Sequence, residues 1–121
     1  MKTILVADDE EDLRVIVQMT LEDPNRRIVE ASDGKVALAL IRKERPDLVI
    51  LDWMMPGMSG IEVVKALRQD PETRHIPVIM LTAKGQAGDQ EEGSGAGAFA
   101  YLVKPFSPLQ LLKKVQEALA S

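Results

Sequence analysis

The residues of this chain that could do chemistry stand directly after short apolar runs. They are three carboxylates, a hydroxyl and an ammonium group, at Asp8, Asp9, Asp52, Thr82 and Lys104. If the runs form neighbouring parallel strands, these side chains meet at one edge of the sheet, because ligands bind outside the carboxyl ends of parallel strands. Carboxylates gathered in this way repel one another, and a bound cation offsets that repulsion.

The ligand types at this edge indicate which cation would bind. Oxygen ligands without His or Cys favour magnesium, manganese or calcium over zinc. Magnesium fits best, because it keeps several waters and uses one or two carboxylates together with a phosphate. A carboxylate, Mg²⁺, a lysine and a hydroxyl are also the parts that move a phosphoryl group. The sequence therefore predicts a Mg²⁺ site, with Mn²⁺ as an alternative, and phosphoryl chemistry.

Short apolar runs alternate with segments of helical periodicity, which predicts a doubly wound α/β fold with a parallel sheet between helices. The predicted strands cover residues 4–7, 27–31, 48–51, 78–81 and 100–103. The first, third and fourth are almost entirely aliphatic, as expected of central strands that are covered on both faces. Arg27 and Glu30 mark the second as an edge strand.

Apolar stripes at helical spacing predict helices between these strands. The stripes are Leu13, Ile16, Val17, Thr20 and Leu21; Ala37, Leu40 and Ile41; Ile61, Val64 and Leu67; and Leu111, Val115, Ala118 and Leu119. Asp33 is predicted to cap the second helix, and Ser107, Pro108 and Gln110 form a start signal for the last. Segment 84–98 holds five of the eight glycines, which predicts a short or frayed fourth helix.

Length and composition exclude several classes of protein. The 121 residues predict a single domain over 1–121, and the absence of cysteine excludes disulfides and thiolate metal sites. Fifteen basic against nineteen acidic residues give a net charge of −4, which argues against direct binding to nucleic acid or an anionic membrane. No apolar run approaches the ~20 residues that span a bilayer. We therefore expect a cytoplasmic protein.

Five motifs in order carry a resemblance to a known family. They are residues Ile4 to Glu10, Asp47 to Asp52, Met55 to Gly60, Pro77 to Ala83 and Tyr101 to Phe106. With them the chain resembles the receiver domain of two-component response regulators, close to the stand-alone chemotaxis (CheY-like) type. The resemblance covers nearly the whole length and implies a flavodoxin-like (βα)5 three-layer sandwich with strand order 2-1-3-4-5.

The resemblance implies a role for each acidic residue of the site. Asp52 would be the phosphoacceptor and a metal ligand. Asp9 would bind Mg²⁺ directly, Asp8 would hold a metal-bound water, and the main-chain carbonyl of Met54 would complete the protein ligands. The neighbouring Glu10 has another explanation, because acidic residues are favoured in the first turn of a helix.

The resemblance also implies a switch between two states. Lys104 would pair with Asp52 and later with the phosphoryl oxygens, through a cis peptide bond to Pro105. Thr82 would move inward to hydrogen-bond the phosphoryl group, which would let Tyr101 turn from an exposed to a buried position. A single covalent charge would thus bias two conformations.

The implied function is a signalling switch, not a conventional enzyme. The partners would be a sensor histidine kinase or phosphotransfer protein, which donates the phosphoryl group from a phosphohistidine, and an unknown downstream protein. Residues 99–101 lack the acidic side chains that relatives fused to winged-helix DNA-binding domains use for symmetric dimers, so we expect a monomer or a dimer of another kind.

Three other classes of protein compete with this interpretation. A haloacid dehalogenase-like phosphohydrolase needs a second aspartate two residues after its nucleophile, where this chain has Met54. A flavodoxin-like cofactor binder needs hydroxyls and free amides after the first strand, where this chain is acidic. A degenerate receiver used only for binding would not need the complete set of Asp8, Asp9, Asp52, Thr82 and Lys104.

Overall fold

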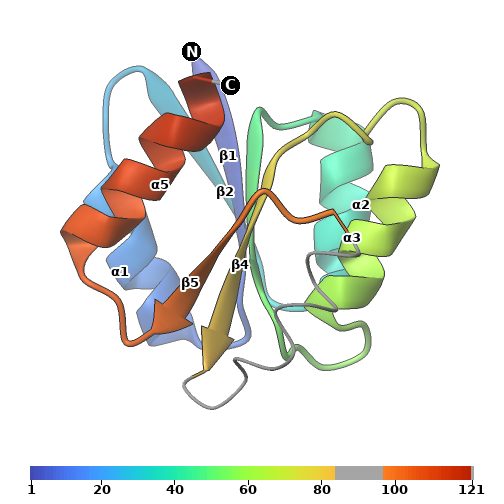
Figure 1. The fold of residues 1–121 in the computed structure, drawn as a ribbon, viewed down its shortest axis with the longest axis horizontal. Coiled ribbons are helices and arrows are strands. Elements are labelled where there is room, and N and C mark those ends of the chain that lie inside the picture. The colour runs from blue at the N-terminus through green and yellow to red at the C-terminus, as the bar shows by residue number, and fades with distance from the viewer. Residues whose placement is uncertain (84–96, 121) are drawn as a thin grey trace.

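The computed structural model describes residues 1–83 and 97–120, which form a central parallel sheet between two layers of helices (Figure 1). The strands are β1 (Lys2–Ala7), β2 (Arg26–Ala31), β3 (Leu48–Asp52), β4 (Val78–Ala83) and β5 (Ala100–Lys104). Their order is β2-β1-β3-β4-β5, and all four pairings are parallel. This arrangement confirms the predicted strand order and the edge position of the second strand.

The described helices cover both faces of the sheet. They are α1 (Glu11–Leu21), α2 (Gly34–Glu44), α3 (Gly60–Gln69) and α5 (Pro108–Ala120). Helices α1 and α5 lie on one face, and α2 and α3 lie on the other (Figure 1). The predicted doubly wound sandwich is therefore confirmed. The predicted fourth helix falls almost wholly on residues 84–96, which lie outside the described part of the chain.

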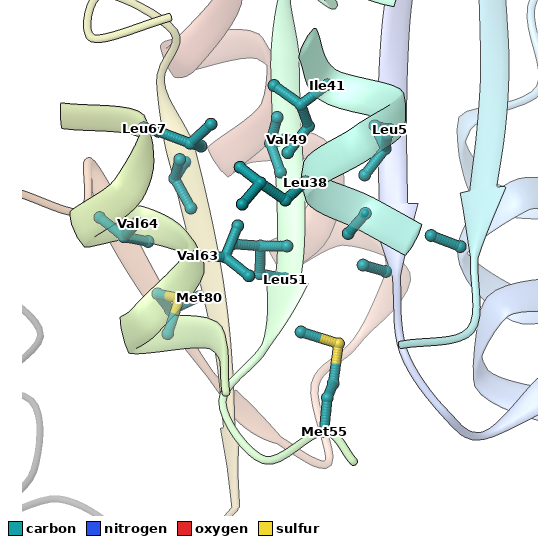
Figure 2. Close-up of a cluster of buried hydrophobic side chains, with 14 of the residues drawn as sticks. Leu5, Leu38, Ile41, Val49, Leu51, Met55, Val63, Val64, Leu67 and Met80 are labelled. Carbon is teal, nitrogen blue, oxygen red and sulfur yellow. The ribbon is translucent and has the colours of Figure 1, made fainter. Parts of the chain in front are cut away.

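Each face of the sheet packs a separate hydrophobic cluster against its helices, because successive residues of a strand point to opposite faces. Leu5, Val49 and Leu51 pack beneath α2 and α3 with Leu38 and Val63 (Figure 2). The alternate residues pack against α1 and α5, and the largest of them are Ile4, Leu48, Ile50, Ile79 and Leu81. Every residue of β3 is buried. This burial holds the end of β3, where Asp52 stands, between two packed layers.

Side-chain caps determine where three of the helices begin. Asp33 accepts a hydrogen bond from the amide of Val36 at 2.9 Å, as predicted for the start of α2. Ser107 and Gln110 cap α5 reciprocally, at 3.1 and 2.9 Å. Helix α3 begins with a similar capping box, made by the side chains and amides of Ser59 and Glu62. The Ser-x-x-Glu spacing carries this signal in the sequence.

The predicted buried stripe of α1 is wrong at one position. Val17 and Leu21 are fully buried, but Ile16 is 51% exposed. Adjacent helical residues are about 100° apart around the axis, and α1 directs Val17 toward the sheet, which leaves Ile16 at the exposed edge of the stripe. No helix within 1–83 or 97–120 has both the length and the apolar character needed to cross a bilayer.

Candidate functional site

The candidate site lies at the carboxyl-terminal edge of four adjacent strands. Asp8 directly follows β1, Asp52 is the last residue of β3, and Lys104 is the last residue of β5. Thr82 lies near the end of β4 and pairs in register with Val103. Since β1, β3, β4 and β5 are consecutive neighbours, the sheet brings these four predicted residues to one place.

Lys104 links the two buried carboxylates of the site. Its Nζ lies 3.2 Å from Oδ2 of Asp8 and 3.2 Å from Oδ1 of Asp52. Both aspartates are buried, whereas the lysine side chain keeps partial access to solvent. The peptide bond from Lys104 to Pro105 is cis. The ammonium group thus stands between two carboxylates that come from the ends of the adjacent strands β1 and β3.

Burial and charge together perturb the titration of these groups. Burial, followed by the charge of Asp8, raises the pKa of Asp52 to about 6, although Lys104 and the amide of Met54 act in the opposite direction. Burial likewise raises the pKa of Asp8. Burial opposes the charged form of Lys104, but the charges of Asp52 and Asp8 outweigh it and raise the pKa of Lys104. With a pKa of about 6, Asp52 is mainly ionised at neutral pH, and the raised pKa of Lys104 favours its ammonium form.

An acidic group beside this triad offers ligands for a divalent cation. Carboxylate oxygens of Asp8, Asp9 and Glu10 all lie within 4.8 Å of one another, and the last two residues are exposed. The ligands are all oxygen atoms, which suits Mg²⁺ or Mn²⁺. Glu10 differs from the expectation that it belongs to the first turn of α1. It precedes the helix, and its Oε1 lies 3.8 Å from Nζ of Lys104.

The turn after β3 is held by main-chain contacts around Asp52. The amide of Trp53 donates to the carbonyl of Leu81 at 2.9 Å, and the carbonyl of Trp53 accepts from the amide of Gly60 at 3.0 Å. The amide of Met54 donates to the carboxylate of Asp52, while its side chain is 61% exposed. A Cβ atom at Gly60 would lie 2.5 Å from the carbonyl oxygen of Asp52, so α3 approaches the end of β3 closely.

Two buried hydroxyls lie near this turn without a protein partner in the described part of the chain. They are Oγ1 of Thr82, a fully buried residue, and the hydroxyl of Tyr101, whose ring is partly buried. The Tyr101 ring lies against Trp53, with centroids 6.4 Å apart. Buried hydroxyls are ordinarily hydrogen-bonded, so each can accept a new partner without breaking an existing bond.

A family model for the response regulator receiver domain matches residues 4–116. The chain belongs to this family. Receiver domains are signalling domains of two-component systems, and phosphorylation is a feature of the family. The match confirms the resemblance inferred from the five sequence motifs.

Curated relatives of this receiver domain include transcriptional regulators. The chain is 43% identical to the phosphate regulon transcriptional regulatory protein PhoB of Pseudomonas aeruginosa, over 98% of this chain and 52% of that protein. It is 44% identical to the transcriptional regulatory protein ResD of Bacillus subtilis, over 96% of this chain and 47% of that protein. The chain thus spans about half the length of these relatives.

Solved structures with the same fold include receiver domains of similar length. A putative response regulator from Chloroflexus aurantiacus superposes with a TM-score of 0.94 at 36% identity, covering 99% of this chain and 98% of that chain. The chemotaxis response regulator CheY4 of Vibrio cholerae has a TM-score of 0.91 at 40% identity, covering 98% and 99%. Both the transcriptional and the chemotaxis members are therefore similar to this receiver domain.

Two features of the receiver domain site were not found from the sequence. In the sequence, Glu10 fits the acidic start of a helix, but in the structure its carboxylate lies next to those of two predicted metal ligands, Asp8 and Asp9. Arg14 has no marker in the sequence that links it to the site, yet its guanidinium donates to the main-chain carbonyl of Asp8. No periodicity or motif in the sequence marks these contacts, because they depend on how α1 leaves the sheet.

Proposed function

We propose that this receiver domain accepts a phosphoryl group on Asp52 from a phosphohistidine of a sensor kinase or phosphotransfer protein. The observation that carries the proposal is the position of Lys104, 3.2 Å from both Asp52 and Asp8. An ammonium ion between two buried carboxylates keeps one of them ionised and ready to act as a nucleophile. The pKa of about 6 for Asp52 leaves this carboxylate mainly ionised at neutral pH.

The transfer replaces a phosphorus–nitrogen bond with a phosphorus–oxygen bond. A carboxylate oxygen of Asp52 attacks phosphorus, and the bond to the donor imidazole breaks. The imidazole nitrogen keeps the electron pair of that bond, and Asp52 becomes an acyl phosphate. Lys104 is placed to exchange its contact with the carboxylate for one with a phosphoryl oxygen, which offsets charge in the transition state.

The residues around Asp52 fit a magnesium ion. Asp8 and Asp9 would hold it together with a carboxylate oxygen of Asp52 and the main-chain carbonyl of Met54, and the adjacent Glu10 adds to the negative charge. A bound Mg²⁺ would offset the negative charge on the transferring oxygens. Mn²⁺ prefers similar ligands and would act as a substitute.

Thr82 and Tyr101 are the residues proposed to report phosphorylation. Each has a buried hydroxyl without a partner in residues 1–83 and 97–120, so a phosphoryl oxygen can gain a hydrogen bond from Thr82 at little cost. A shift of Thr82 would leave space beside β4 for Tyr101 and change the outer face of β5. The net charge of −4 does not favour DNA, so the proposed target of this face is a downstream cytoplasmic protein.

Intact-mass analysis after incubation with acetyl phosphate and Mg²⁺ tests this proposal. The wild-type domain should gain the mass of one phosphoryl group, and EDTA should abolish the gain. Asp52→Asn should gain nothing, whereas Asp12→Asn, at an exposed aspartate of α1, should behave as wild type. A phosphoryl group that still appears on Asp52→Asn would overturn the assignment of the acceptor.

A further inference from the structure

We propose that Arg14 positions the acidic residues Asp8 and Asp9 for the metal ion by holding the peptide group between them. This inference rests on the function proposed above, because it concerns the same Mg²⁺ site. Arg14 would not contact the ion or the phosphoryl group, so its role is one of positioning.

The contact is a charge-assisted hydrogen bond to the main chain. Nη1 of Arg14 lies 2.6 Å from the carbonyl oxygen of Asp8. That carbonyl belongs to the peptide group that joins Asp8 to Asp9, so its direction determines how the chain turns from one carboxylate to the next. Hydrogen bonds to charged donors are stronger than those between neutral groups, which favours a single orientation of this peptide.

Glu30 on β2 holds the guanidinium in place. Nε of Arg14 lies 3.4 Å from Oε1 of Glu30, and the Arg14 side chain is only 16% exposed. A planar guanidinium can contact a carboxylate through one nitrogen and a carbonyl through another, which an ammonium group cannot do in the same geometry. Arg14 therefore connects the edge strand β2 to the turn after β1.

The remaining polar atoms of Asp8 are held from other directions. Its amide donates to the carbonyl of Ala31 at 3.1 Å. Its carboxylate accepts from the amide of Glu10 at 2.8 Å and from Lys104 at 3.2 Å. The contact from Arg14 completes this set, so that the main chain and the side chain of Asp8 are both constrained. Loss of Arg14 would release only the carbonyl, and with it the direction of Asp9.

The sign of the effect separates positioning from simple electrostatics. A guanidinium close to a cation site repels the cation, so removal of its charge alone would tighten Mg²⁺ binding. Removal of a group that orients the ligands would weaken Mg²⁺ binding instead. Changes to groups that orient metal ligands commonly lower metal affinity by 10- to 100-fold.

The test is a Mg²⁺ titration followed by the fluorescence of Trp53, the only tryptophan, which directly follows Asp52. We expect Arg14→Gln to raise the dissociation constant for Mg²⁺ about tenfold. Arg14→Lys, which keeps the charge and one donor, should recover part of the loss. Glu30→Gln should also raise the dissociation constant, by a smaller factor. An unchanged or lower dissociation constant in Arg14→Gln would overturn the inference.

Controls separate this inference from effects on folding and from the proposed function. Arg27→Gln removes an exposed guanidinium from the same edge strand, where it pairs with Glu44, and should leave the dissociation constant unchanged. Thermal unfolding in EDTA reports the stability of each variant without the metal ion. If Arg14→Gln does not fold, the test uses Arg14→Lys and Glu30→Gln instead. A dissociation constant for Mg²⁺ that is unchanged in both variants refutes the positioning role of Arg14.

Parallel measurements on the wild type keep the two proposals apart. If the wild-type domain shows no Mg²⁺ response and no phosphorylation of Asp52, the proposed function fails and the inference fails with it. If the wild type responds normally and Arg14→Gln binds Mg²⁺ equally well, only the role of Arg14 is refuted. Phosphorylation of Arg14→Gln should recover at high Mg²⁺, because the variant keeps every residue that contacts the reacting atoms.

Discussion

Lys104 and Asp52 are in contact although the strands that carry them are not neighbours. Nζ of Lys104 lies 3.2 Å from Oδ1 of Asp52, and β4 separates β5 from β3 in the sheet. The lysine side chain therefore reaches across the end of β4, where Lys104 is in register with Ala83. Asp52, the proposed phosphoacceptor, therefore contacts a residue that lies 52 positions later in the chain (104 − 52).

Removal of the lysine charge should slow phosphorylation. In Lys104→Met the charge on the transferring oxygens loses its ammonium partner. Removal of one preorganised stabilising group typically lowers the rate about 10²- to 10³-fold, and we expect a decrease of this size in the phosphorylation rate. The rate of phosphorylation by acetyl phosphate, measured by mass spectrometry, checks this. Lys114→Met, at a more exposed lysine of α5, should retain the wild-type rate. Equal rates in the two variants would contradict the role of Lys104.

The raised pKa of Asp52 predicts a dependence of stability on pH. Because the pKa of Asp52 is about 6 in the folded state against 3.8 for an unperturbed aspartate, the folded state binds more protons between these two pH values. Wild-type stability in EDTA should therefore fall as pH rises through 6. Asp52→Asn lacks this loss and should be more stable at pH 7.5, by about 1–2 kcal/mol after allowance for solvent screening.

Urea unfolding of both proteins at pH 5 and pH 7.5 measures this difference. The stability advantage of Asp52→Asn should be larger at pH 7.5 than at pH 5. Asp12→Asn serves as the control, since this exposed aspartate should give a difference that does not change with pH. A constant advantage of Asp52→Asn at both pH values would show that the carboxylate is not destabilised by burial.

Magnesium should change the fluorescence of the metal-free domain. Trp53 is buried directly after Asp52, so an ion bound at the acidic group would alter its surroundings. Asp9→Asn should weaken the response, because it removes one carboxylate from that group, and Asp12→Asn should not. A flat titration at millimolar Mg²⁺ with an intact far-UV spectrum would contradict the metal site.

The close approach of α3 to Asp52 predicts an unequal effect of two glycine substitutions. Gly60→Ala would place Cβ 2.5 Å from the carbonyl oxygen of Asp52, a main-chain atom that cannot move freely. Overpacking of this kind costs about 1–3 kcal/mol. The variant should also be phosphorylated more slowly, because relief of the clash displaces Asp52.

Gly57→Ala is the matched comparison for that substitution. Gly57 lies in the same turn with φ of +80°, and a Cβ there would meet no atom within 4 Å. Its cost is the backbone strain alone, about 1 kcal/mol, and it should leave the phosphorylation rate nearly unchanged. Chemical unfolding and phosphorylation rates of the two variants check this order. A larger kinetic defect in Gly57→Ala would contradict it.

The amino-acid sequence by itself determined the architecture and the place of the chemistry. Alternating apolar runs and stripes predicted the strands and helices, because strand and helix periods depend on local sequence. Ligands bind outside the carboxyl ends of parallel strands. The residues that stand at those ends, Asp8, Asp52, Thr82 and Lys104, were therefore predicted to form the site. The helical periodicity wrongly predicted that Ile16 is buried. Its side chain is apolar but is exposed beside the buried stripe of α1.

Only the tertiary structure decided which side chains touch. The contact of Lys104 with Asp8 joins residues 96 positions apart, and the pair of Arg14 with Glu30 joins a helix to an edge strand. These distances depend on how the layers pack and how α1 leaves the sheet, which no local pattern encodes. For the same reason Glu10 could be assigned to a helix terminus from the sequence, but its place beside Asp8, Asp9 and Lys104 required the folded chain.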